Sequence, residues 1–201
     1  MSIRRTTTRV TVAAVAGTVL IAGLGAPAAI AADATGVTVT GGTLSITVDP
    51  VVGDFTGVTL DGTAKTTTAT FAGFEVNDAR GSGAGWNVTV QGTQFAEFDS
   101  TLNAGAGGLV TGGKTLALNS LSLVVPTVAA DGTTSTAPSI RTGPHTIDAA
   151  SAVKIASAAA DTGMGKYDFT QAATPLTLSI PSTAYAKTYR STVTVSTVTG
   201  P

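Results

Sequence analysis

The chain has 201 residues, with 11 basic and 12 acidic side chains, one histidine and no cysteine. So few positive charges leave no basic patch to neutralise phosphates, which excludes nucleic acid as an expected partner. A disulfide framework is excluded outright, and a zinc site is not expected because it needs several histidine or cysteine ligands.

The first 31 residues have the pattern of a secretory signal peptide. Three arginines between positions 4 and 9 precede an apolar run over residues 11–25, and small residues at 29 and 31 form a cleavage site. The apolar run is shorter than the ~20 residues that a membrane-spanning helix needs. Residues 1–31 are therefore predicted to direct secretion by the general route and to be removed, leaving no membrane span.

The expected mature chain covers residues 32–201, with 8 basic against 12 acidic side chains, a net charge of −4. This length suffices for a single domain with a hydrophobic core. The mature chain has no second apolar segment and no cysteine that could carry a lipid. It is expected to remain on a cell only by binding something there.

The mature chain is rich in threonine and valine, which favour strands because their branched side chains suit a pleated surface. Apolar residues alternate with hydroxyl residues in short runs at 37–40, 44–48, 88–90, 176–180 and 191–199. Glycine-containing turn signals separate these runs. The pattern predicts an all-β fold, a single antiparallel β-sandwich-like domain over residues 32–201.

The alanine-rich segment 148–160 is ambiguous. Alanine favours a helix, whereas Val153 and Ile155 flank Lys154 in the alternation of a strand. Two glycines follow at 163 and 165. We predict a strand or a loop here.

Catalytic patterns are sparse, and no enzyme, cofactor or metal is predicted. The single histidine, His145, lies in a turn context, and a nucleophile elbow and a calcium-binding loop are both missing. Glu97 and Asp99 are two residues apart and would share one side of a strand, as a hydrolase with two carboxylates would need. A solvated strand end that discourages edge pairing explains these two acids better.

The segment at 77–90 gathers the most distinctive residues of the chain. Asp78 and Arg80 are spaced to face the same side of an extended segment and to pair. Gly81 and Gly85, with a third glycine between them, allow the chain to reverse tightly. We predict a hairpin here.

Trp86, the only tryptophan, opens the second strand of this predicted hairpin. It is expected to pack beside Phe74 or Val76 of the first strand. Two interpretations remain open for its ring: a core anchor, or a surface that stacks on a ligand.

This block, from Val76 to Val90, resembles the first signature of the WxL-domain surface proteins of Gram-positive bacteria, in which an acidic residue and Arg-Gly precede a Gly-Trp strand. Residues 176–201 resemble the end of that family: an apolar strand, a proline, a strand begun by Tyr189, and a final Gly-Pro. The chain departs from the family at two points. Valine follows Trp86-Asn87 in place of leucine, and Val195-Ser196-Thr197 occupies the place of a second W-x-L, so the second tryptophan is missing.

The resemblance implies a secreted, cell-wall-associated protein that attaches non-covalently to peptidoglycan and forms complexes with other surface proteins. Trp86, Tyr185 and Tyr189 would then supply aromatic contacts to glycan. Asp78, Arg80, Gly81 and Gly85 would be motif residues that set the turn. The alternative is an interaction module that binds a surface protein through its sheet edges, without recognising glycan.

Overall fold

Strands dominate this computed structural model, which describes residues 36–46, 52–132 and 135–201. The predicted signal peptide lies outside the described residues. Residues 39–201 form one unit. Its strands, in chain order, are β1 (Leu44–Ile46), β2 (Lys65–Ala69), β3 (Phe74–Asp78), β4 (Trp86–Gly92), β5 (Ala96–Asp99), β6 (Gly108–Leu109), β7 (Leu121–Val124), β8 (Thr127–Asp131), β9 (Ser139–Ile140), β10 (Pro144–Thr146), β11 (Val153–Ala158), β12 (Gly165–Thr170), β13 (Leu176–Ile180), β14 (Tyr189–Arg190) and β15 (Val193–Thr199), with one 3-10 turn at Asn103–Gly105.

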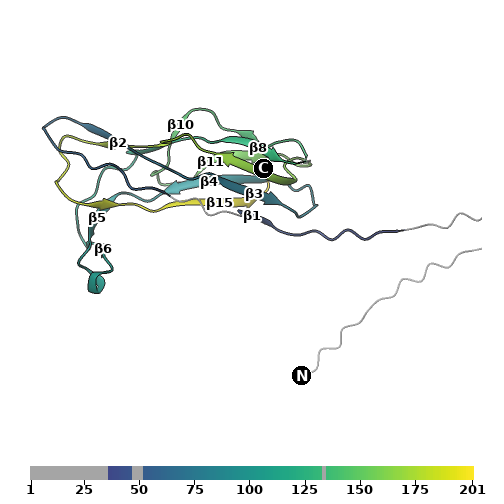
Figure 1. The fold of residues 1–201 in the computed structure, drawn as a ribbon, viewed down its shortest axis with the longest axis horizontal. Helices are drawn as coiled ribbons and strands as arrows, with labels where there is room; N and C mark the ends of the chain where they lie inside the picture. Colours follow the sequence, from purple (N-terminus) through teal and green to yellow (C-terminus); the bar gives the residue numbers. More distant parts are fainter. Residues whose placement is uncertain (1–35, 47–51, 133–134) are drawn as a thin grey trace, which may run out of the picture. The chain divides into compact units, whose positions relative to one another are not determined.

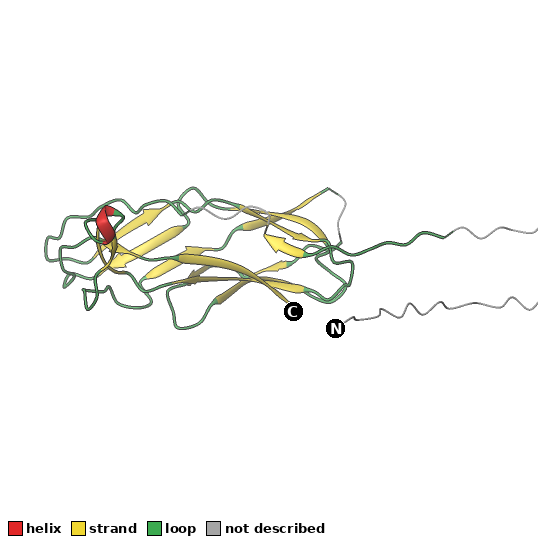
Figure 2. Ribbon diagram, turned by 90° about the horizontal axis from the view of Figure 1, so that it is seen from below, coloured by secondary structure: helices red, strands yellow, loops and turns green. Residues whose placement is uncertain are grey.

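The strands form antiparallel sheets (Figure 1). Three sheets have four strands, in the orders β1-β3-β12-β8, β10-β7-β13-β2 and β15-β4-β11-β9, and a three-stranded sheet has the order β14-β5-β6. Figure 2 shows the strands stacked in layers. The predicted all-β, antiparallel, sandwich-like fold is confirmed.

The core lies where the inward faces of these sheets meet. Alternate residues of β3 are buried, and so are most residues of β4. The rings of Phe74 and Phe169, on the paired strands β3 and β12, stack with centroids 4.8 Å apart. Burial of such large apolar surfaces supplies the main driving force for folding, because this chain has no disulfide to restrain it.

A buried carboxylate, Asp148, binds the backbone at the start of β7. Asp148 is fully buried, and its Oδ2 accepts hydrogen bonds from the Ser120 backbone N–H at 2.9 Å and the Ser120 hydroxyl at 3.0 Å. Its Oδ1 accepts from the N–H of Leu121 at 3.0 Å. Asp148 thus compensates the cost of its own burial by holding the chain at the start of β7.

The strand predictions succeeded unevenly. The run at 176–180 is β13, and the ambiguous segment 148–160 contains strand β11 and no helix. The run at 37–40 is not in a strand, because alternation gives a segment the tendency to pair but does not provide a neighbour.

The predicted hairpin at 74–90 is wrong. Strand β3 pairs with β1 and β12, whereas β4 pairs with β11 and β15. Residues 79–85 therefore carry the chain from one sheet into another. The strands on each side of this segment find their partners elsewhere in the sequence.

Candidate functional site

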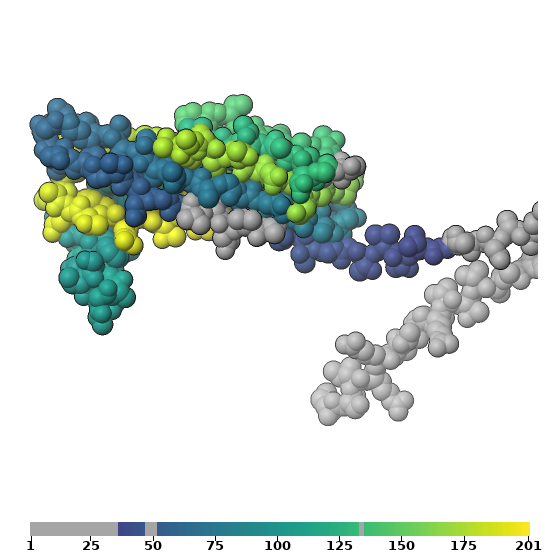
Figure 3. All heavy atoms as spheres, in the orientation of Figure 1, coloured from purple at the N-terminus to yellow at the C-terminus, as the bar shows by residue number. Residues whose placement is uncertain are grey.

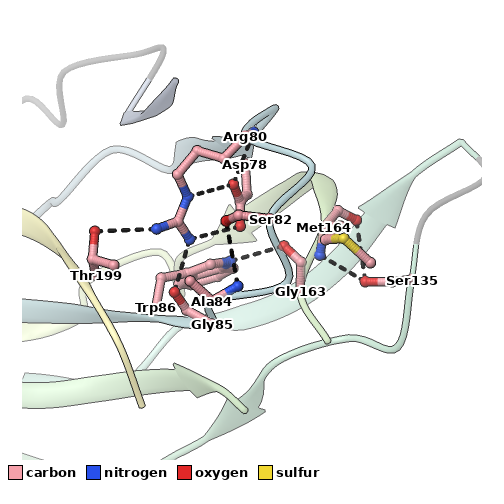
Figure 4. A network of polar contacts seen from close by, with 10 residues as sticks. All are labelled: Asp78, Arg80, Ser82, Ala84, Gly85, Trp86, Ser135, Gly163, Met164 and Thr199. Carbon is pink, nitrogen blue, oxygen red and sulfur yellow. Dashed lines mark hydrogen bonds and ion pairs between the residues drawn. The ribbon is translucent and has the colours of Figure 1, made fainter. Parts of the chain in front are cut away.

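The junction between β3 and β4 is built around the predicted pair Asp78 and Arg80. The Arg80 guanidinium donates from Nε to Asp78 Oδ1 at 2.8 Å and from Nη2 to Asp78 Oδ2 at 2.9 Å, which makes a bidentate ion pair (Figure 4). The Asp78 side chain is 2% exposed and that of Arg80 is 15% exposed. The hydrogen bonds from Arg80 lower the pKa of Asp78, so the carboxylate remains charged.

Arg80 also links the junction to the last strand. Its Nη2 donates to the carbonyl of Gly85 at 2.7 Å, and its Nη1 donates to the hydroxyl of Thr199 at 3.1 Å. The N–H of Gly200 donates to the same Gly85 carbonyl at 3.2 Å, and the amide of Asn87 donates to the Gly200 carbonyl. One side chain thus joins the end of β3, the start of β4 and the end of β15.

The junction's glycines, of which Gly81 and Gly85 are two, meet different requirements. Gly81 and Gly85 have φ of +64° and +68°, in the left-handed region that other residues adopt at a cost. A Cβ on Gly81 would meet nothing, but one on Gly85 would lie 2.5 Å from the carbonyl oxygen of Ala158. Gly81 therefore serves the turn alone, while Gly85 also lets β4 approach its neighbour β11.

Trp86 lies in the core, with no exposed surface. Its indole N–H donates to the carbonyl of Gly163 at 2.8 Å, and its ring centroid lies 6.0 Å from that of Tyr167 and 6.5 Å from that of Phe169, both on β12. The ring therefore joins two sheets instead of packing within a hairpin. A ring with no accessible face cannot stack on a sugar, so the geometry supports the core interpretation of Trp86 and not the ligand-contact one.

Tryptophan fluorescence tests this placement directly, because Trp86 is the only indole. The folded protein should emit at short wavelength, resist quenching by acrylamide, and keep the same spectrum when peptidoglycan is added. Unfolding in urea should shift the emission to the red and expose it to quencher. A red, readily quenched emission from the folded chain would contradict the buried position.

Tyr185 and Tyr189 lie together in a different region, at a groove of about 960 Å³ that we call the tyrosine groove. Residues 52–60 (blue in Figure 3) and 184–191 (yellow) line it. Its apolar lining includes Phe55 and Phe95, whose rings meet edge to face at 5.7 Å. The Tyr189 hydroxyl donates to the carbonyl of Tyr185 at 3.0 Å. Partial burial raises the pKa of the Tyr189 hydroxyl. The Tyr185 side chain is more open to solvent, with 58% of its surface exposed.

Lys114 was missed by the sequence analysis, because 71 positions separate it from its partner. Its Nζ lies 4.4 Å from the centroid of the Tyr185 ring, within the range of a cation–π contact. No local sequence pattern predicts a contact between Lys114 and Tyr185. The contact arises because the Lys114 segment lies against β5, which in turn pairs with β14.

The two acids considered for catalysis are held as charged carboxylates. Glu97 Oε2 accepts a hydrogen bond from the backbone N–H of Lys114 at 2.9 Å, and Glu97 Oε1 forms an ion pair with Lys187 at 2.9 Å. Both interactions lower the pKa of Glu97, the one with Lys114 more strongly. Hydrogen bonds from Thr101 lower the pKa of Asp99. A glycosidase needs one carboxyl group with a raised pKa to act as the acid, and neither of these two groups meets that condition.

The single histidine lies against a backbone carbonyl. His145 has its Nε2 3.0 Å from the carbonyl oxygen of Thr142. Across the ranges that the structure describes, no three histidine or acidic side chains gather as metal ligands. No helix in the same ranges is long and apolar enough to cross a membrane.

The two signature blocks lie on adjacent strands. Strand β15 pairs with β4 from Val193 opposite Gly92 to Thr199 opposite Trp86. The Arg80 junction is at the Trp86 end, and the tyrosine groove, which includes Val193, is at the other, about 20 Å away along the strand. Val88, two residues after Trp86, is fully buried in the core.

Comparison with known families gives one match. A family model described as "WxL domain surface cell wall-binding" matches residues 31–201. The chain belongs to this WxL family. The match includes both blocks and every described strand. No curated protein and no solved structure matches this WxL chain.

Proposed function

We propose that this WxL protein is secreted, does not catalyse a reaction, and associates non-covalently with the bacterial cell wall by binding peptidoglycan at the tyrosine groove. Membership of a cell-wall-binding surface family supports the wall as its partner. The observation that carries the choice of site is Tyr185, an aromatic ring that is 58% exposed at the edge of a groove.

An exposed tyrosine suits a sugar, because the face of the ring packs on the apolar C–H surface of a pyranose while the hydroxyl stays in water. The apolar lining at Phe55 and Phe95 allows further contact in the groove. Trp86 has no part in this proposal, because its ring lies in the core. Other surface proteins remain proposed partners.

The proposal is tested by sedimenting the mature protein with purified peptidoglycan freed of protein. We expect binding, and we expect Tyr185→Ala to weaken it about fivefold, since an aromatic contact contributes about 1 kcal/mol. The Tyr185 side chain is exposed, so its loss should leave the fold and the Trp86 emission unchanged.

Val198→Ala is the matched control, because Val198 is 50% exposed but pairs opposite Asn87, at the other end of the β4–β15 ladder. It should bind as the unaltered protein does. Equal binding by the unaltered protein, Tyr185→Ala and Val198→Ala would show that the groove is not the binding site. Absence of binding by all three would contradict peptidoglycan recognition itself.

The sheet-edge alternative is favoured by one observation. Strand β15 is the edge of its sheet and presents Thr194, Ser196 and Val198 to solvent. Such an edge can accept a strand from another protein. This alternative predicts no sedimentation with protein-free peptidoglycan, so the same experiment separates the two functions.

A further inference from the structure

Two cations beside the tyrosine groove lie against aromatic rings. Lys114 lies over Tyr185, and the Arg190 guanidinium lies 4.1 Å from the centroid of Phe98. Arg190 lines the groove, and both cations are exposed. Within the described ranges neither forms an ion pair with a carboxylate. An aromatic ring carries no net charge, so it attracts a cation without cancelling the charge.

The nearby carboxylates are largely occupied. Glu97 uses one oxygen for Lys187 and the other for the N–H of Lys114, and its side chain is only 14% exposed. Asp99 accepts both the N–H and the hydroxyl of Thr101, at 2.8 and 2.7 Å. Asp54 is the one exposed acid that lines the groove. Lys187, 47% exposed, has further N–H donors besides the one directed at Glu97.

Three cations (Lys114, Lys187 and Arg190) and three acids (Asp54, Glu97 and Asp99) surround the groove, and in the described part of the chain only Lys187 among these cations is in an ion pair. The expected mature chain carries a net charge of −4, which by itself repels an anionic polymer. A cluster of cations around an exposed aromatic ring is therefore a specific feature of this surface and not a consequence of composition.

We propose that the groove recognises a carboxylate-bearing segment of the wall glycan, with sugar C–H surface on Tyr185 and the carboxylate beside Lys114 and Arg190. This inference rests on the proposed function. Peptidoglycan carries its negative charge as carboxylates of its peptide stems, whereas phosphodiesters belong to polymers attached to it. The ligand is thus a peptide-substituted sugar and not a neutral glycan chain.

The test compares sedimentation of the mature protein with three forms of protein-free peptidoglycan: untreated, stripped of phosphodiester-linked polymers by acid, and stripped and then amidated at its carboxylates. We expect stripping to leave binding unchanged and amidation to reduce it about tenfold. Added salt should weaken binding to the stripped form and have little effect on the amidated one.

The variant Lys114→Gln/Arg190→Gln should lower affinity for stripped peptidoglycan about tenfold and lose most of the salt dependence. Its matched control is Lys154→Gln/Arg141→Gln, which makes the same change of charge at two exposed positions that do not line the groove. The control should bind like the unaltered protein.

Three results would overturn the inference. They are equal binding to amidated and unamidated peptidoglycan, loss of binding on removal of phosphodiesters, and equal weakening by the two double variants. In the first and third cases wall binding itself persists and the proposed function stands. Absence of any binding by the unaltered protein would instead remove the proposed function on which the inference rests.

Discussion

Replacing Arg80 with alanine should lower the free energy of unfolding by about 3 kcal/mol. The substitution leaves the Asp78 carboxylate, which is 2% exposed, without the guanidinium that forms its bidentate ion pair. It also removes donors from the carbonyl of Gly85 and the hydroxyl of Thr199. Urea unfolding followed by Trp86 emission measures the loss.

The pH dependence gives this prediction a specific signature. Because Arg80 lowers the pKa of Asp78 in the folded state, the pair stabilises the protein above the ordinary aspartate pKa, and this stabilisation is lost as the pH falls through the folded value. The difference between Arg80→Ala and the unaltered protein should therefore be largest near neutral pH and shrink below about pH 4. A difference that stays constant with pH would show that the ion pair is not its source.

Arg141→Ala is the matched control for Arg80→Ala, because Arg141 is exposed and its side chain makes no hydrogen bond or ion pair in the described part of the chain. We expect it to change the free energy of unfolding by less than about 0.5 kcal/mol. If both variants lost the same stability, the links from Arg80 to Gly85 and Thr199 would have no energetic importance.

Replacing Gly163 with alanine should destabilise the protein by about 4 kcal/mol. Gly163 has φ of +72°, and an added Cβ would overlap the Cβ of Ala158 and lie 2.8 Å from Nε1 of Trp86. The indole must move to relieve this contact, and its hydrogen bond to the Gly163 carbonyl is then lost. We expect a lower urea midpoint and a red-shifted emission from the folded state.

Gly112→Ala separates the two causes of this loss. Gly112 has nearly the same backbone conformation, with φ of +69°, but a Cβ there would meet no atom within 4 Å. It should cost only the backbone strain, about 1 kcal/mol. The remaining 3 kcal/mol measures how tightly the Trp86 pocket is packed, and similar losses for both glycines would show that this pocket tolerates an extra carbon.

These variants bear on what the first signature block does. Asp78, Arg80, Gly85 and Trp86 all act on the joint between sheets in this structure: Trp86 packs on β12, and Arg80 holds the end of β15. The block therefore stabilises the fold, and the exposed Tyr185 lies at the groove near the other end of the β4–β15 pair.

The sequence by itself determined the features that depend on near neighbours. The bias to threonine and valine with period-two alternation predicted an all-β fold, and the i, i+2 spacing of Asp78 and Arg80 predicted their ion pair. It also placed the start of a strand at Trp86. Each of these follows from backbone geometry over a few residues, so a single sequence carries enough information.

Only the tertiary structure decided which strands are neighbours. The pairing of β4 with β15 joins residues 107 positions apart at Thr89 and Ser196, and many alternating Thr/Val strands would satisfy that edge equally well. This choice turned the predicted hairpin into a crossing between sheets and buried Trp86 against Tyr167. It also brought Lys114 to Tyr185, because contacts between distant segments depend on how the sheets stack and not on any local pattern.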